Sequence, residues 1–170
     1  MTIHNSQSDA LHGVVDSFFS PHAPADVVAA LQQARDTDDS SQREAQFQVI
    51  LKRWPSCLDG HIVWIKFLFG QNRLREAEAA AWTALREASR QGGFPRNYRV
   101  LTKEQAPWLA EGSSARLYLF CLKALGVVRL RRGRLTQSHT ALSKLLELDR
   151  HDEIGGGSFL EIVENMLEAD

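Results

Sequence analysis

Few residues of this sequence stand in a pattern that could support catalysis. The six histidines are scattered along the chain, and none of them has a recognisable partner pattern for acid–base or nucleophilic chemistry. The P-loop, the dinucleotide fingerprint, the serine elbow G-x-S-x-G and the zinc motif H-E-x-x-H do not occur. We therefore expect a protein that is not an enzyme and that uses no cofactor.

Residues that could bind a metal ion are also sparse. Cys57 and Cys121 lie in different segments, without the paired spacing that indicates a zinc site, and we expect both to be small buried side chains. His151, Asp152 and Glu153 could each contact a metal, but a polar loop between two helices explains them better. The sequence predicts no metal site.

Four arginines crowd one short segment, and their forked side chains suit carboxylate or phosphate groups. These are Arg129, Arg131, Arg132 and Arg134. One interpretation is a site for an acidic partner surface; the other, which we favour, is a solvated helix end, where cations also suit the helix dipole. Nucleic acid is not expected, because no aromatic residue interleaves with the cluster and the chain balances 20 basic against 21 acidic residues.

The irregular segment 91–112 is the best candidate for a binding surface. Its glycines and prolines break helical periodicity, and long irregular segments in compact domains commonly bind partners. Its aromatic and cationic side chains are of types enriched at interface hot spots. They are Phe94, Arg96, Tyr98, Arg99, Lys103 and Trp108. An alternative stays open, in which the aromatic side chains fold back and cover the apolar helices on either side.

Helical patterns surround these residues. Ala, Leu, Glu, Gln and Arg dominate, and no stretch alternates as a strand would, so we predict an all-α fold and one domain over residues 1–170. Residues 1–7 are expected to be disordered. Apolar periodicity predicts helices over 8–19, 24–35, 41–54, 59–69, 74–89, 114–132 and 135–148, followed by a C-terminal capping helix from 158.

Two helix starts carry the S-x-x-E pattern of a capping box. Ser41 with Glu44 is expected to begin one helix, and Ser158 with Glu161 the last one. The three glycines 155–157, just before the last helix, predict either a flexible turn or a hinge that lets that helix dock on a partner.

Two segments resemble the tetratricopeptide repeat, in which small residues stand where paired helices cross. One segment contains Leu125-Gly126 and Gly133-Arg134-Leu135. The other begins with Asn72-Arg73-Leu74. Leu74 and Leu135 are 61 residues apart, which is one 34-residue repeat plus an insertion of about 27 residues. The insertion is the irregular segment 91–112. The sequence departs from the repeat at Asn72, where glycine is usual. The resemblance implies a short solenoid of about three helix pairs that binds a peptide or a protein face without chemistry of its own.

The stretch from Asn97 to Pro107, with residues 145–149, resembles small tetratricopeptide-like proteins encoded among nitrogen-fixation accessory genes. That resemblance implies a factor that docks on nitrogenase or an assembly intermediate and guards it. We expect a chaperone-like adaptor whose partner is another protein, with no nucleic acid, membrane or small-molecule substrate. The alternative is a homo-oligomeric structural or regulatory protein. Because no export signal or apolar span is evident, we expect a cytoplasmic location.

Overall fold

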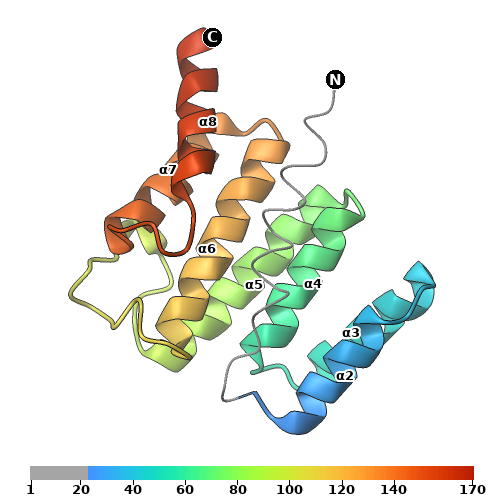
Figure 1. Cartoon of the computed structure of the whole chain (residues 1–170). Helices are drawn as coiled ribbons and strands as arrows, with labels where there is room; N and C mark the ends of the chain where they lie inside the picture. Colours follow the sequence, from blue (N-terminus) through green and yellow to red (C-terminus); the bar gives the residue numbers. More distant parts are fainter. Residues whose placement is uncertain (1–22) are drawn as a thin grey trace.

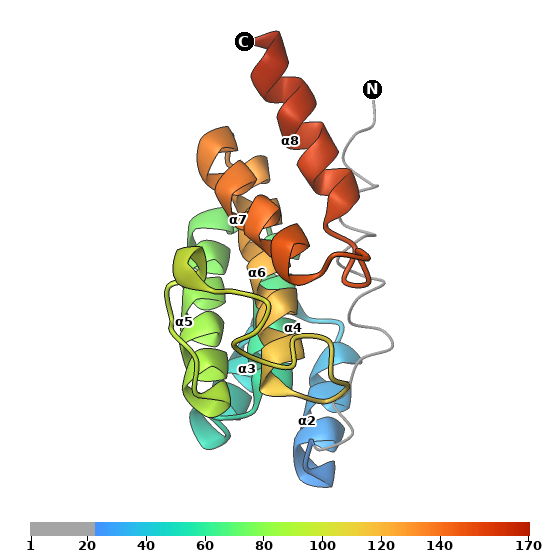
Figure 2. The same ribbon diagram turned by 90° about the vertical axis from the view of Figure 1, so that its left-hand side faces the viewer.

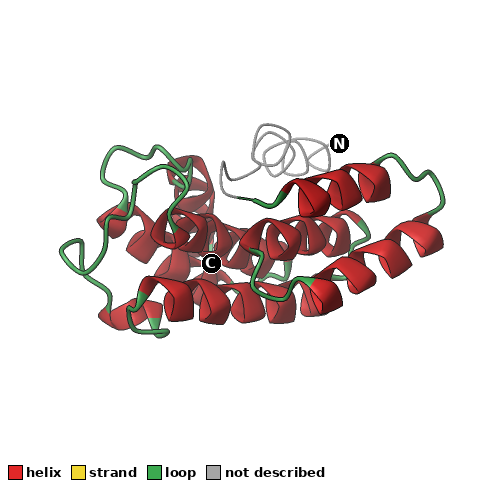
Figure 3. Cartoon of the chain, turned by 90° about the horizontal axis from the view of Figure 1, so that it is seen from below, coloured by secondary structure: helices red, strands yellow, loops and turns green. Residues whose placement is uncertain are grey.

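The computed structural model describes residues 23–170, so the predictions for residues 1–7 and 8–19 lie outside the described residues. In the described part the chain forms seven α-helices and one short 3₁₀ turn, without strands, which confirms the all-α prediction (Figure 3). The helices are α2 (Ala25–Arg35), α3 (Ser40–Arg53), α4 (Leu58–Gly70), α5 (Leu74–Gly92), α6 (Ser114–Arg131), α7 (Leu135–Leu148) and α8 (Gly157–Ala169), and the 3₁₀ turn is η1 (Tyr98–Val100). None of these helices has the length and hydrophobicity that crossing a bilayer requires.

Consecutive helices pack side by side (Figure 1). Helix α5 packs against α4 and α6, α6 packs in turn against α7, and α2 packs against α3. The last helix, α8, rests on α7 and extends past it (Figure 2). Each helix therefore covers the apolar face of its neighbours, as a stack of helical hairpins does.

The α4–α5 and α6–α7 turns have the same geometry. Asn72 in the first turn and Gly133 in the second both adopt a left-handed backbone, with φ of 57° and 71°. In each turn the next residue donates its backbone N–H to the carbonyl five residues back, at 2.9 Å: Arg73 to Leu68, and Arg134 to Arg129. Asparagine tolerates this conformation better than most residues other than glycine. Asn72 therefore meets the geometric requirement of the turn.

Small side chains let the paired helices approach closely. Four alanines of α5 are completely buried: Ala77, Ala81, Ala84 and Ala88. Where α6 and α7 cross, a β-carbon added to Gly126 would lie 2.6 Å from Leu142, and the Ser138 hydroxyl donates to the Gly126 carbonyl at 2.7 Å. Only glycine fits position 126 without displacing the Leu142 side chain.

The capping box predicted at Ser41 and Glu44 is wrong. Helix α3 begins one residue earlier, at Ser40, because the Asp39 carboxylate accepts the backbone N–H of Gln42 at 2.8 Å. A carboxylate suits a helix N-terminus better than a hydroxyl does, since its charge also favours the dipole. Glu44 instead forms an ion pair with Arg73 at 2.8 Å.

The box predicted at Ser158 and Glu161 is wrong for a similar reason. Asp152 accepts the backbone N–H groups of Gly156 and Gly157 at 2.6 and 3.0 Å, so a carboxylate from the preceding loop serves the start of α8. In the same loop the buried Asp149 carboxylate accepts two further N–H groups. The start of α8 is thus held by Asp152, while Asp149 fixes the loop that leads to it.

Packing explains the glycine at position 156. A β-carbon there would lie 2.5 Å from a methyl group of Leu145 in α7. Gly156 therefore allows α8 to approach α7 closely. A flexible turn or a hinge is not needed to account for it.

Gly156→Ala is expected to lower the free energy of unfolding by about 1–3 kcal/mol, because the added methyl overpacks the α7–α8 contact. Urea unfolding followed by circular dichroism measures the change. Gly70→Ala is the matched control, since nothing lies within 4 Å of the added atom. Equal stability of the two variants would contradict the close approach at Gly156.

Candidate protein-binding surface

The aromatic residues of the insertion lie in the hydrophobic core. Phe94, Tyr98 and Trp108 expose only 7%, 2% and 4% of their surface. The Phe94 ring lies 4.8 Å from the Trp108 ring and 5.0 Å from the Tyr118 ring of α6, measured between centroids. The prediction that these three aromatics contact a partner is therefore wrong. By folding back on α6, the three side chains remove apolar surface from water that an exposed loop would leave solvated.

Polar contacts hold the backbone of the insertion in place. Residues 91 and 92 belong to α5, and the irregular segment runs from 93 to 113. Tyr118 donates its hydroxyl to the Arg96 carbonyl at 3.2 Å, and Lys144 of α7 donates to the Leu101 carbonyl at 2.9 Å. The Trp108 indole N–H donates to the Thr102 carbonyl at 2.9 Å. The insertion is thus anchored to both α6 and α7.

The cationic residues of the insertion face solvent. Arg96, Arg99 and Lys103 are exposed, and so is Val100 at 54%. Lys103 lies 3.8 Å from the exposed Glu104, a pair of little energetic weight. Within residues 23–170, neither Arg96 nor Arg99 forms an ion pair with a carboxylate. These side chains can still receive an acidic partner.

Glu78 of α5 is a site residue that sequence reasoning missed. Its side chain is buried and accepts hydrogen bonds from three arginines of the predicted cluster: Arg129 Nε at 2.8 Å, Arg132 Nη1, and Arg134 Nη1 at 3.3 Å. A signal was available, because Glu78 is spaced at i, i+4 and i+7 with Trp82 and Leu85 on a helix whose neighbouring face is all alanine.

The electrostatics of this cluster leave an excess of positive charge. Burial by itself raises the pKa of the Glu78 carboxyl, but hydrogen bonds and charges from Arg129 and Arg132 outweigh it and hold the pKa below its ordinary value. One carboxylate thus faces three guanidinium groups. Arg132 and Arg134 expose 22% and 42% of their side chains, so part of this excess charge reaches the surface.

Two arginines of the cluster differ from the expectation. Arg129 is only 8% exposed, and besides Glu78 it binds the Tyr98 hydroxyl at 3.1 Å, so its predicted contact with a partner is wrong. Arg131 does not contact Glu78; its guanidinium lies 5.2 Å from the ring centroid of Phe69 in α4. Arg129 is a structural cation, and Arg131 lies outside the Glu78 cluster.

The hydrogen bond from Arg129 to Tyr98 joins the two regions that the sequence singled out. Tyr98 also stacks on Trp82 of α5, with centroids 5.9 Å apart, and Arg99 follows it directly. We call the solvent-accessible cations of these two regions the cationic surface: the exposed Arg96, Arg99 and Lys103 of the insertion, with the partly exposed Arg132 and the exposed Arg134 of the α6–α7 turn. It combines fixed backbone with accessible positive charge.

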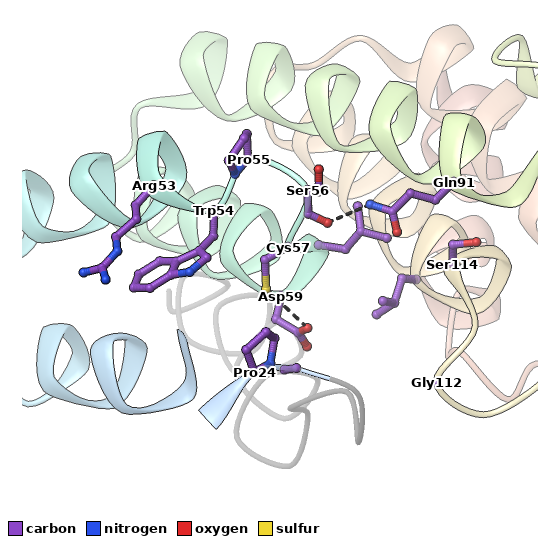
Figure 4. A pocket seen from close by; sticks show the side chains of 13 residues that line it. Pro24, Arg53, Trp54, Pro55, Ser56, Cys57, Asp59, Gln91, Gly112 and Ser114 are labelled. Atoms are coloured by element: carbon purple, nitrogen blue, oxygen red, sulfur yellow. Dashed lines mark hydrogen bonds between the residues drawn. The ribbon is translucent and has the colours of Figure 1, made fainter. Parts of the chain in front are cut away.

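A separate pocket of about 460 Å³ opens between the α3–α4 loop, the end of α5 and the start of α6 (Figure 4). Gln91 donates to the Ser56 carbonyl at 2.6 Å, and the Cys57 thiol donates to Asp59 at 3.8 Å. Burial raises the pKa of the half-buried Cys57 thiol, so at neutral pH it stays protonated and is a weak nucleophile. Cys121 is completely buried, as expected, whereas Cys57 lies at the wall of this pocket.

In residues 23–170 these features describe packed helical hairpins with a cationic surface formed by the insertion and the α6–α7 turn. Comparison with known protein families, with curated proteins and with solved structures finds no match to this chain. Among residues 23–170, no group of three or more His, Cys, Asp or Glu side chains converges as a metal site would.

Proposed function

We propose that this chain is a non-catalytic protein-binding adaptor or chaperone-like accessory factor that binds an acidic face of another protein through the cationic surface. The observation that carries the proposal is the exposure of Arg96 and Arg99 without a carboxylate partner in the described residues. Both side chains extend from a backbone anchored to α6 and α7. Because this backbone is already held in place, binding of the guanidinium groups to a carboxylate carries no cost for ordering the loop.

The proposal includes a tetratricopeptide-like origin for the helix pairs. The matching left-handed turns at Asn72 and Gly133, and the close crossing at Gly126, support it. The sequence resemblance makes a nitrogenase component, or an intermediate in its assembly, the first partner to test. A cytoplasmic location is part of the same proposal.

Because the aromatic side chains are buried, the large side chains that the insertion can present to a partner are mainly charged. Only Val100 adds a large exposed apolar group to the insertion. Charged side chains at the solvent-accessible edge of an interface contribute mostly to association rate and specificity. Dissolved salt screens the attraction between such charges. We therefore expect a salt-sensitive complex.

The double variant Arg96→Glu and Arg99→Glu is expected to reduce partner recovery at least about ten-fold, because it places like charges against an acidic face. The tagged protein is purified from its native cells grown with and without the need to fix nitrogen, and nitrogenase subunits are quantified. The matched control is Arg75→Glu with Arg86→Glu, which changes the net charge equally on exposed positions of α5. Circular dichroism checks that both variants fold.

Recovery of nitrogenase subunits only under nitrogen-fixing growth, and its loss in the insertion variant alone, is the expected result. Absence of these subunits under that growth condition refutes the nitrogenase proposal. Equal loss in the α5 control variant refutes a role for the cationic surface, since any change of net charge would then suffice.

A homo-oligomeric structural or regulatory protein is the second candidate. Exposed apolar side chains on α8, at Ile162, Met166 and Leu167, favour it. Sedimentation velocity of the purified chain distinguishes the two. A stable homo-oligomer at micromolar concentration would replace the adaptor proposal.

A further inference from the structure

The α4–α5 turn contains an arginine that binds two carboxylates. Arg73 is the last residue before α5, and its Nη1 atom lies 2.8 Å from a carboxylate oxygen of Glu44 in α3. Its Nε and Nη2 atoms donate to the two carboxylate oxygens of Glu76, at 3.0 and 2.7 Å, and Glu76 lies in the first turn of α5. The Nε–Nη2 edge of Arg73 thus binds Glu76 through the two parallel hydrogen bonds that suit a guanidinium and a carboxylate.

The α6–α7 turn has an arginine at the equivalent position. The two turns share their left-handed backbone, so Arg134, which directly precedes α7, corresponds to Arg73. The Nη1 atom of Arg134 lies 3.3 and 3.4 Å from the two carboxylate oxygens of Glu78, much as Nη1 of Arg73 contacts Glu44. These two glutamates are 34 residues apart, the length of one tetratricopeptide repeat. Each arginine therefore binds a glutamate from the preceding helix pair.

Arg134 lacks the second carboxylate in the described part of the chain. The residue that corresponds to Glu76 is Gln137, and the first turn of α7 contains no acidic residue. Within residues 23–170, the Nε and Nη2 atoms of Arg134 have no hydrogen-bond partner, and its side chain is 42% exposed. A glutamine amide carries no charge and cannot replace the carboxylate. The guanidinium edge that binds Glu76 in the α4–α5 turn is thus available in the α6–α7 turn.

The charge balance around Arg134 favours an anion. Glu78 is the one carboxylate that contacts Arg129, Arg132 and Arg134 within the described residues, so this cluster has two positive charges in excess. At Arg73, by contrast, one guanidinium faces two carboxylates. A carboxylate that approaches Arg134 therefore meets net attraction and lowers the mutual repulsion of the three arginines.

We propose that the Nε–Nη2 edge of Arg134 is a binding site for a carboxylate group of the partner protein, which takes the place that Glu76 has beside Arg73. The inference rests on the proposed protein-binding function and names one contact of the cationic surface. The carboxylate comes from an aspartate or glutamate side chain, or from a C-terminal carboxyl group of the same chemistry. Two parallel hydrogen bonds fix the orientation of the bound group as well as attracting it.

Gln137→Glu tests the site directly, because it gives α7 the glutamate that α5 has. The new carboxylate is expected to bind Arg134 from within the chain and to exclude an incoming one. A glutamate in the first turn of a helix also suits the helix dipole, so the variant should fold and keep its stability in urea unfolding. Gln48→Glu, which adds the same charge at an exposed position of α3, is the matched control.

Three short, fluorescently labelled peptides distinguish the sources of the carboxylate. The first contains several glutamates and has an amidated C-terminus. The second has glutamine in their place and ends in a free carboxyl group, and the third is amidated and has lysine instead of glutamate. Fluorescence anisotropy of the full chain at low salt measures affinity. Gln137→Glu is expected to weaken binding of the first or the second peptide at least about five-fold, and Gln48→Glu to change it less than about two-fold.

Arg134→Lys separates two parallel hydrogen bonds from charge alone. Lysine keeps the positive charge but presents a single ammonium group, so affinity for the same peptide is expected to fall at least about three-fold. Arg75→Lys, at an exposed position of α5, is the control and should leave binding unchanged. Circular dichroism confirms that each variant is helical.

Unchanged affinity in Gln137→Glu overturns the inference, and so does unchanged affinity in Arg134→Lys, because charge alone would then be sufficient. An equal loss in Gln48→Glu also overturns it, since added negative charge at any position would have the same effect. If these variants bind the peptides normally while Arg96→Glu with Arg99→Glu still loses partner recovery, the proposed function stands without this site. A wild-type chain that binds the lysine peptide as well as the carboxylate peptides contradicts the cationic surface itself.

Discussion

Replacing Trp108 with alanine is expected to lower the free energy of unfolding by about 3–5 kcal/mol, because it empties a fully packed site. The indole is 4% exposed and packs against Phe94 and Tyr118, with ring centroids 4.8 and 6.0 Å away. Its N–H also closes the loop on the Thr102 carbonyl. We expect the insertion to detach from α6 in this variant.

Urea unfolding measures the loss, and limited trypsin digestion reports on the insertion, whose Arg96, Arg99 and Lys103 become easier to cleave. Val100→Ala is the control, because Val100 lies in the same segment at 54% exposure and should change stability by less than about 0.5 kcal/mol. A loss of stability in Trp108→Ala would show that Trp108 acts in the core, in place of the direct partner contact expected from the sequence. A Trp108→Ala protein that keeps wild-type stability and loses its partner would instead support that earlier hypothesis.

The second large effect is expected at Glu78. Glu78→Gln keeps the size of the side chain but leaves the buried Arg129 cation without a counter-charge, so the free energy of unfolding should fall by about 3 kcal/mol. Because Arg129 also binds Tyr98, the insertion should loosen together with the α5–α6 contact.

Chemical unfolding at neutral pH measures this change. Glu76→Gln, on the same helix and in an exposed pair with Arg73, is the control and should change stability far less than Glu78→Gln does. A double-mutant cycle with Arg129→Met isolates the coupling of the pair. A coupling energy near zero would show that the burial of Glu78 beside Arg129 contributes nothing to stability.

The lowered pKa of the Glu78 carboxyl predicts how the free energy of unfolding changes with pH. The folded-state pKa of Glu78 is below the ordinary value of 4.5, so its stabilising contribution is complete above that value. The contribution decreases as the pH falls through the lower folded-state pKa. The Glu78→Gln variant should lack this part of the acid sensitivity.

The helices were predictable because their signals are local. Apolar periodicity placed the helix Leu135–Leu148 at its observed bounds, and it placed the ends of α4 and α6 within a residue. Helix starts were less secure, since Asp39 and Ser41 both can cap a helix and only the backbone path decides between them. The glycine at 156 was visible as a turn residue, but its contact with Leu145 was not.

The binding surface was predictable only in part. The insertion and the arginine-rich turn were recognised as special, and Arg96, Arg99 and Lys103 are exposed as a binding surface requires. The aromatics could not be assigned, because the same residue types form hydrophobic cores and interface hot spots. One interpretation from sequence assigned the arginine cluster an acidic partner in another molecule. The structure shows an acidic partner in the same chain, Glu78.

The sequence by itself determined the all-α class and the approximate helix bounds in the described residues, since propensity and periodicity act between near neighbours in the chain. Tertiary structure decided which charged and aromatic groups remain available. The Glu78–Arg129 hydrogen bond spans 51 residues and the Tyr98–Arg129 hydrogen bond spans 31. Burial and Coulomb energies depend on such distant neighbours, so only the packed helices show that Tyr98 and Arg129 are internal while Arg96 and Arg99 face solvent.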